Sequence, residues 1–279
     1  MGTNSLPTSE RHAEDFSGDE LPFSERDSAH LPGHWLLARL GKRVLRPGGL
    51  ELTQHMLDHA KAEGGDVVEF APGLGRTATE ILGHSPASYI GVDEDPKAAA
   101  IVGQIVAGRG HCITANASDT GLPEASADVV VGEAMLTMQS DRGRQKIIAE
   151  AARLLRPGGR YAIHELGLQP DTLDTKVKNA IRKELAQSIK VSARPLTAAE
   201  WTALLKDAGF EVDWVDAAPM ALLNMKRNIA DEGIIGVLRI VKNLLKDSQA
   251  RSRVLTMKRT FTKYKKHING IAIVAHKLG

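Results

Sequence analysis

The sequence has a single cysteine, Cys112, so it can form neither an internal disulfide nor a thiolate metal cluster. A reducing cytoplasm is therefore the expected compartment. No apolar run approaches the roughly 20 residues needed to cross a bilayer. Aromatic residues make up only 4% of the chain, which leaves few rings for stacking on bases and argues against a nucleic-acid partner. The histidines are scattered without metal-ligand spacing, so no metal site is expected.

Charge is nearly balanced over the 279 residues, at a formal +2, but it is unevenly distributed. Residues 1–30 hold seven acidic and two basic residues and lack the basic start and apolar middle of a signal peptide. We expect them to form a disordered leader. Residues 222–279 hold thirteen lysines and arginines against three acidic residues. The length allows residues 31–279 to form one domain.

Apolar segments that predict strands alternate with segments of helical periodicity. The expected strands are 66–71, 88–93, 111–115, 127–132 and 160–166, and the expected helices between them are 76–83, 97–107 and 142–155. This alternation predicts a parallel sheet covered on both faces. A helix at 171–190, a strand at 210–216, a long helical region at 222–265 and a closing strand at 268–278 would follow.

We therefore expect a doubly wound, Rossmann-like α/β fold. Its mostly parallel sheet would have seven strands, the last antiparallel. Two N-terminal helices, within 34–49 and 50–65, would close over the cofactor. The stretch 219–266 is too long for a hairpin loop, so it is expected to be a helical insertion that acts as a lid.

A glycine-rich loop follows the first expected strand in "VVEFAPGLGRTA", residues 67–78. Gly73 and Gly75 fit the pattern G-x-G-x-x-A, in which backbone N–H groups face a ligand where a helix begins. Asp93 ends the next strand 18 residues after Gly75, a spacing at which an acid can bind ribose hydroxyls. These residues predict an adenosine-containing cofactor, and by themselves they fit NAD as well as other nucleosides.

Glu69 distinguishes between these cofactors by the sign of its charge. It lies four residues before Gly73, at the end of the strand where a doubly wound sheet binds its ligands. Charges a few ångströms apart near a surface interact by on the order of a few kcal/mol, so a pyrophosphate would be repelled. S-adenosylmethionine would instead place its ammonium and sulfonium groups there. The structural alternative is a solvated acid at the strand end.

Five motifs, in order within 66–166, resemble those of the class I S-adenosylmethionine-dependent methyltransferases. They are VVEFAPGLG, YIGVDEDP, ITANASDTGLP, ADVVVGEAML and LLRPGGRYAI. The group that they resemble most is the small-molecule enzymes that include the quinone-biosynthesis C-methyltransferases. The resemblance implies transfer of a methyl group from S-adenosyl-L-methionine to a small-molecule acceptor, with S-adenosyl-L-homocysteine as the product.

The same resemblance implies which residues hold the cofactor. They are Glu69, Ala71, Pro72, Gly73, Gly75, Asp93, Glu94, Asn116, Ala117, Glu133 and Ala134. The family commonly has an acidic residue at the adenine amino group, where this chain has Asn116. The amide oxygen of Asn116 can accept the same hydrogen bond without the charge.

Glu133, His164 and Glu165 are the candidates for a general base, which is required only if the acceptor must lose a proton. Methyl transfer from a sulfonium is an in-line displacement with a neutral leaving group, so alignment in a dry pocket can supply much of the rate. Strand alternation puts His164 and Glu165 on opposite faces, so we expect only one of them to meet the cleft. A structural hydrogen bond is the alternative role for all three. His30, His34, His55 and His59 are expected at the surface or in packing.

The expected insertion carries an apolar row beside basic residues. The row consists of Ile234, Val237, Leu238, Val241, Leu244 and Leu245, and Arg239, Lys242 and Lys246 occupy other faces. One interpretation is a lid helix that packs this row on the core. Another is that the row covers an apolar or anionic acceptor, with peripheral contact to a membrane surface. The basic stretch 251–267 is expected to be a solvated face, from which Tyr264 could reach the acceptor.

Two other functions fit parts of the sequence. The first is an NAD(P)-dependent dehydrogenase of Rossmann type, against which stand Glu69 and the lack of a Y-x-x-x-K pair for proton transfer. The second is a non-catalytic relative that binds the cofactor as a scaffold. The sequence leaves open the acceptor and the oligomeric state.

Overall fold

The computed structural model describes residues 21–23, 25–220 and 225–279, so most of the expected disordered leader lies outside the described residues. The main sheet has the strand order β3-β2-β1-β4-β5-β8-β7. These strands are β1 (Asp66–Phe70), β2 (Ser88–Asp93), β3 (His111–Thr114), β4 (Ala127–Glu133), β5 (Leu155–Leu168), β7 (Phe210–Pro219) and β8 (Ile268–Lys277). β1 to β5 pair in parallel, and β8 is antiparallel to both of its neighbours.

The expected α/β fold, with a mostly parallel sheet and an antiparallel last strand, is confirmed. One addition is β6 (Leu196–Thr197), a two-residue strand that pairs with β5 beside the main path. β5 is longer than expected because it begins at Leu155 and continues through the glycine pair.

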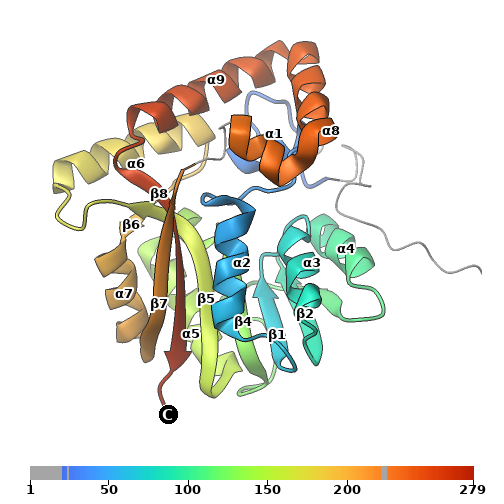
Figure 1. The fold of residues 1–279 in the computed structure, drawn as a ribbon, viewed down its shortest axis with the longest axis vertical. Coiled ribbons are helices and arrows are strands. Elements are labelled where there is room, and N and C mark those ends of the chain that lie inside the picture. The colour runs from blue at the N-terminus through green and yellow to red at the C-terminus, as the bar shows by residue number, and fades with distance from the viewer. Residues whose placement is uncertain (1–20, 24, 221–224) are drawn as a thin grey trace, which may run out of the picture.

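Helices cover both faces of the sheet (Figure 1). One face is packed by α2 (Gly49–Ala60), α3 (Arg76–Gly83) and α4 (Pro96–Ile105). The other is packed by α5 (Asp141–Leu154) and α7 (Ala198–Asp207). α2 was expected to close over the cofactor, and this prediction is wrong. Its apolar residues Leu52, Met56 and Leu57 are buried against the sheet face instead.

Two helix starts follow directly from local sequence. The Asp95 carboxylate accepts hydrogen bonds from the N–H groups of Lys97 and Ala98, and Pro96 occupies the first turn of α4. Thr197 and Glu200 form the expected capping box of α7. These caps fix where the helices leave the carboxyl ends of the strands.

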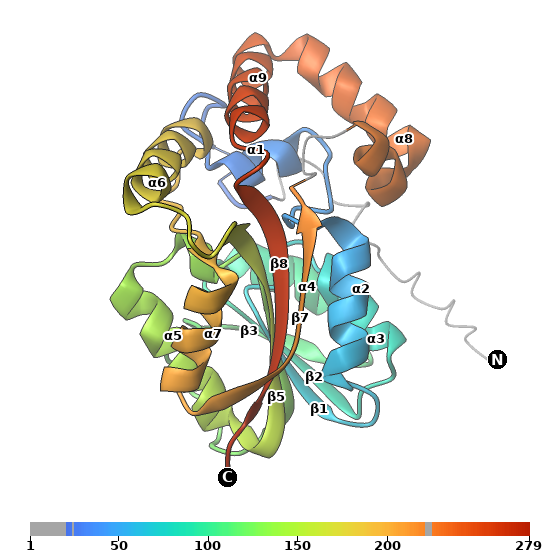
Figure 2. The ribbon, with the colours of Figure 1, turned by 60° about the vertical axis from the view of Figure 1, so that its left-hand side comes forward.

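Four helices gather at the carboxyl ends of the parallel strands, at the end of the molecule opposite the C-terminus (Figures 1 and 2). This helical cap consists of α1 (Gly33–Arg39), α6 (Thr175–Ile189), α8 (Met225–Lys246) and α9 (Ser248–Lys263). The helical region expected at 222–265 consists of the two helices α8 and α9. They separate at Asp247, whose side chain caps α9 by accepting from the N–H of Ala250. α8 is itself kinked at Gly233, where φ is 69°.

The cap holds the N-terminal segment in place through contacts between distant parts of the chain. The Glu232 carboxylate on α8 accepts from the backbone N–H groups of Arg43 at 3.0 Å and Val44 at 2.8 Å. Arg253 on α9 donates to the carbonyl oxygens of Ser28 at 2.9 Å and Leu31 at 2.5 Å. Residues 28–48 are consequently fixed between the cap and the sheet.

The apolar row of α8 is largely exposed. Ile234, Leu238 and Leu245 have exposed fractions of 69%, 63% and 69%. The interpretation that this row packs on the core is wrong for these three residues, because α8 contacts the rest of the cap through a face that includes Leu244 of the row. On that face Asn243 donates to the Leu40 carbonyl and Leu244 joins a buried cluster. None of the described helices has the length and apolar character that a membrane span requires.

Candidate functional site

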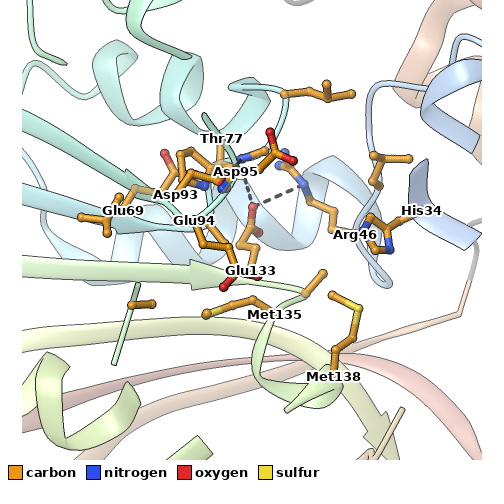
Figure 3. A pocket seen from close by; sticks show the side chains of 18 of the residues that line it. His34, Arg46, Glu69, Thr77, Asp93, Glu94, Asp95, Glu133, Met135 and Met138 are labelled. Atoms are coloured by element: carbon orange, nitrogen blue, oxygen red, sulfur yellow. Dashed lines mark hydrogen bonds and ion pairs between the residues drawn. The ribbon is translucent and has the colours of Figure 1, made fainter. Parts of the chain in front are cut away.

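A cavity of about 630 Å³ lies at the carboxyl ends of β1, β2 and β4, and α1 and the segment after it contribute to its lining (Figure 3). All but one of the residues expected to hold the cofactor line it. The exception, Gly75, acts through the backbone: it caps α3 with φ at 72°, and a Cβ there would lie 2.6 Å from a methyl carbon of Ile105. The predicted cofactor residues are therefore brought together in one place.

Asp93 ties the end of β2 to the glycine loop. One of its carboxylate oxygens accepts from the N–H of Gly73 at 3.1 Å, and the other accepts from the N–H of Asp95 at 3.0 Å. Burial raises the pKa of Asp93. The same carboxylate lines the cavity, so it both orients the loop and faces the cavity.

Glu69 lies at the end of β1 and is only 2% exposed, which excludes a solvated strand-end acid. The Tyr89 hydroxyl donates to its carboxylate at 2.6 Å. Burial raises the pKa of Glu69 to about 8, and the hydrogen bond from Tyr89 only partly opposes this effect. A cationic ligand in the cavity would stabilise the ionised form.

Glu133 ends β4, the strand that pairs with β1, and also lines the cavity (Figure 3). Its carboxylate accepts from the hydroxyls of Thr53 and Thr77 and forms an ion pair with Arg46, whose Nε lies 3.3 Å away. Burial alone would raise the pKa of Glu133, but Arg46 and the hydrogen bond from His164 outweigh it and hold the pKa at about 2. Glu133 is thus a fixed negative charge and a weak proton acceptor.

His164 is completely buried and does not line the cavity. The backbone N–H of Gly48 donates to its Nε2 at 2.9 Å, so Nε2 carries no proton. The proton therefore lies on Nδ1, which is 3.0 Å from Glu133 and donates to it. His164 joins the segment before α2 to the end of β4.

Glu165 is completely buried on the other side of β5. It accepts from the N–H groups of Met135 at 3.0 Å, Leu136 at 2.7 Å and Thr137 at 3.0 Å, and from the Thr137 hydroxyl. It therefore holds the loop after β4, part of which lines the cavity. The expectation that one of His164 and Glu165 meets the cleft is wrong, since each is enclosed by structural partners.

Asn116 lines the cavity, but its amide oxygen is engaged. That oxygen accepts from the N–H of Ser118 at 2.9 Å and from its hydroxyl at 2.8 Å. The amide nitrogen of Asn116 donates to Glu94 at 3.4 Å. The hydrogen bond expected from an adenine amino group would have to displace one of the Ser118 donors.

Several residues of the N-terminal segment line the cavity, in agreement with the expectation that a helix within 34–49 closes over the cofactor, although none of them was predicted as a site residue. Arg46 is 5% exposed, and its Nη1 has no hydrogen-bond partner among the described residues. His34, on α1, was expected at the surface or in packing; instead it lines the cavity, and burial lowers the pKa of its imidazole to about 4. The sequence feature next to Arg46 is the turn at Pro47–Gly49. The structure shows why a glycine is needed in this turn, because a Cβ on Gly48 would lie 2.9 Å from His164 Nε2.

Two further residues lie away from the cavity. The Tyr264 hydroxyl donates to Glu184 at 2.7 Å and Tyr264 does not line the cavity, so its predicted reach to the acceptor is wrong. Cys112 packs against a buried cluster, and burial raises the pKa of its thiol to about 12, so it is a packing residue. No group of three potential metal ligands lies together in the described part of the chain.

The family of methyltransferase domains matches residues 68–163, which carry Glu69, the glycine loop, Asp93 and Glu133. A protein of Haemophilus influenzae described as uncharacterized is 33% identical over 255 residues, covering 88% of this chain and 98% of that protein. The chain belongs to the class I S-adenosylmethionine-dependent methyltransferases. S-adenosyl-L-methionine is its methyl donor, and the dehydrogenase alternative is set aside.

Solved structures share the fold of this methyltransferase at low sequence identity. Phosphoethanolamine N-methyltransferase 2 of Haemonchus contortus, bound to S-adenosylhomocysteine, has a TM-score of 0.69 and 16% identity, over 94% of this chain and 60% of that one. A geranyl diphosphate methyltransferase bound to the methyl donor has a TM-score of 0.59 and 14% identity, over 81% and 84%. The [4+2]-cyclase SpnF has a TM-score of 0.63 and 16% identity, over 82% and 81%. A cyclase among these structures shows that the fold alone does not specify the reaction.

Proposed function

We propose that this methyltransferase holds the methionine end of S-adenosylmethionine between Glu69 and Glu133 and methylates a small apolar acceptor. The observation that carries the proposal is the pair of buried carboxylates at the ends of β1 and β4, which face one cavity. Burying acids is costly unless positive charge accompanies them. A ligand with an ammonium and a sulfonium group would supply that charge.

The remaining cofactor contacts follow from the chemistry of the donor. Its ribose would meet Asp93 and Glu94 at the end of β2, and its body would cross the backbone of Ala71 to Gly73. The methionine end also carries a carboxylate beside its ammonium. The Nη1 of Arg46, buried and without a partner among the described residues, is placed to donate to it.

The protein's contribution to the chemistry is positioning. When bound, S-adenosylmethionine supplies a methyl group on a sulfonium, and the leaving thioether is neutral. We propose in-line displacement in a cavity from which the cap excludes water. Glu133, with a pKa of about 2, would act as a fixed charge, and His164 and Glu165 would be positioning residues rather than bases.

The proposed acceptor class comes from the cap side of the cavity. Phe23, Trp35 and Leu45 line it from the N-terminal segment, and Met138 lines it from the turn after β4. Such a lining favours an apolar molecule, oriented by a few polar groups. His34, with a pKa of about 4, would present a neutral imidazole to it.

The test is incubation of the enzyme with isotopically labelled methyl donor and cell extract, followed by mass spectrometry of the labelled product. We expect label in a small molecule that partitions into organic solvent. Glu69→Gln should lower the labelling rate at least about tenfold, whereas Glu63→Gln, at an exposed site, should not change it. Label confined to protein or nucleic acid, or full activity of Glu69→Gln, would overturn the proposal.

A further inference from the structure

The outer face of α8 is an exposed apolar stripe. Ile234, Leu238, Val241 and Leu245 follow one another at spacings of four, three and four residues, so they line one side of the helix. Their exposed fractions are 69%, 63%, 38% and 69%, and that of the adjacent Ile235 is 76%. A contiguous apolar stripe of this kind on a helix indicates a contact surface.

Basic residues border this stripe. Arg239, Lys242 and Lys246 each directly follow an apolar residue of the stripe, and all three are exposed. The outer face of α9 adds the exposed residues Arg251, Lys258 and Arg259.

Negative charge is nearly missing from α9 and from the part of α8 after its kink; the two other acidic residues of α8, Asp231 and Glu232, precede the kink, and Glu232 is bound to the N-terminal segment. Asp247 is the only acidic residue from Gly233 to Lys266. Its carboxylate accepts from the Ser28 hydroxyl at 2.5 Å and from the N–H of Ala250 at 2.8 Å. It is therefore engaged inside the cap, and the outer surface of α8 and α9 is positive and apolar.

We propose that α8 and α9 dock on an anionic lipid surface, with the apolar stripe in the acyl boundary and the lysines and arginines among the headgroups. This combination is what an interfacial helix presents. An anionic leaflet attracts basic residues near its surface by about 1 kcal/mol for each Lys or Arg. Nucleic acid would match the charge but would leave the isoleucine and leucine side chains in water.

The position of α8 and α9 leaves their outer surface accessible to a lipid surface. α8 and α9 lie at the end of the molecule farthest from the C-terminus, and no other helix or strand of the described residues lies beyond them (Figures 1 and 2). The opposite side of α8 is committed to the protein through Glu232 and Asn243. Docking would therefore use the exposed face of α8, which is not packed against the rest of the protein. The docking proposal does not depend on the acceptor class proposed above.

The test is co-sedimentation of the full-length chain with vesicles of phosphatidylcholine alone and with phosphatidylglycerol added. We expect binding to the anionic vesicles, weakening at high salt. Reversing two charges in Lys242→Glu/Lys246→Glu should reduce the partition coefficient at least about tenfold. Leu238→Glu should reduce it similarly, since it places a charge in the apolar stripe.

Matched controls separate docking from general charge effects and from misfolding. Lys146→Glu/Lys206→Glu makes the same charge change at exposed sites on α5 and α7, and Val215→Glu changes an exposed apolar residue on β7. Both should bind vesicles like the unaltered protein, and all variants should keep their affinity for S-adenosylhomocysteine. Equal binding to both vesicle types, or stripe variants that bind normally, would overturn the proposal. A dimer in sedimentation velocity that Leu238→Glu dissociates, without vesicle binding, would show that the occupant is a second copy instead.

Discussion

Three buried carboxylates differ in the donors around them, and this difference assigns their roles. Glu165 accepts four hydrogen bonds, and Glu133 has Arg46, two threonines and His164. Among the described residues Glu69 receives one, from Tyr89. Glu69 therefore has the most to gain from a cationic ligand.

The pKa of Glu69 predicts proton release when the methyl donor binds. With a pKa of about 8 in the free protein, Glu69 is mostly protonated at pH 7, and a bound cation favours the ionised form. Affinity should thus fall as the pH drops below 8, by up to about tenfold per pH unit. Calorimetry at pH 7 in buffers of different ionisation enthalpy should show release of close to one proton, and Glu69→Gln should release none. Equal release by both proteins would contradict this role.

Glu165 makes a prediction about stability. Glu165→Ala would leave three buried N–H groups of the loop after β4 without an acceptor, so we expect a loss of about 3 to 5 kcal/mol in the free energy of unfolding. Urea denaturation measures it, with the exposed Glu124→Ala as the control. If Glu165→Ala were as stable as the unaltered protein but inactive, Glu165 would be catalytic rather than a positioning residue.

At the scale of elements, α8 holds in place the segment around residues 42–46, which lines the cavity. Glu232→Ala removes the acceptor of the Arg43 and Val44 N–H groups. We expect amide hydrogen exchange in residues 42–46 to accelerate by about tenfold, which corresponds to roughly 1.4 kcal/mol. Glu211→Ala, exposed on β7, should leave exchange there unchanged. Unaltered exchange in Glu232→Ala would show that packing alone holds the segment.

Sequence periodicity predicted the elements of the central sheet well and the cap poorly. Strands such as Ser88–Asp93 and helices such as Arg76–Gly83 were predicted with their observed bounds, since each carries its own apolar pattern. The stripe on α8 was also visible in the sequence, but a hydrophobic pattern does not say what covers it. Its orientation depends on Glu232 and Asn243, whose partners lie about 190 to 200 residues away in the sequence.

At the scale of the whole molecule, the site combines residues at the strand ends, which the sequence predicts, with residues of the N-terminal segment, which it does not identify. Glu69, Asp93 and Glu133 follow from the sheet, because parallel strands bring their carboxyl ends to one edge. Arg46 and His34 come from the N-terminal segment over that edge, where the sequence predicted a closing helix but did not identify these two residues as part of the site. The positive outer surface of α8 and α9 is likewise a property of the assembled cap.

The most direct measurement is the calorimetric affinity of Glu69→Gln for S-adenosylmethionine at pH 7.5, compared with the unaltered protein and with Glu63→Gln. Loss of one buried charged contact should weaken binding by about ten- to a hundredfold, and the exposed control should bind normally. Undiminished affinity in Glu69→Gln would contradict the claim that buried negative charge at the end of β1 selects a cationic cofactor.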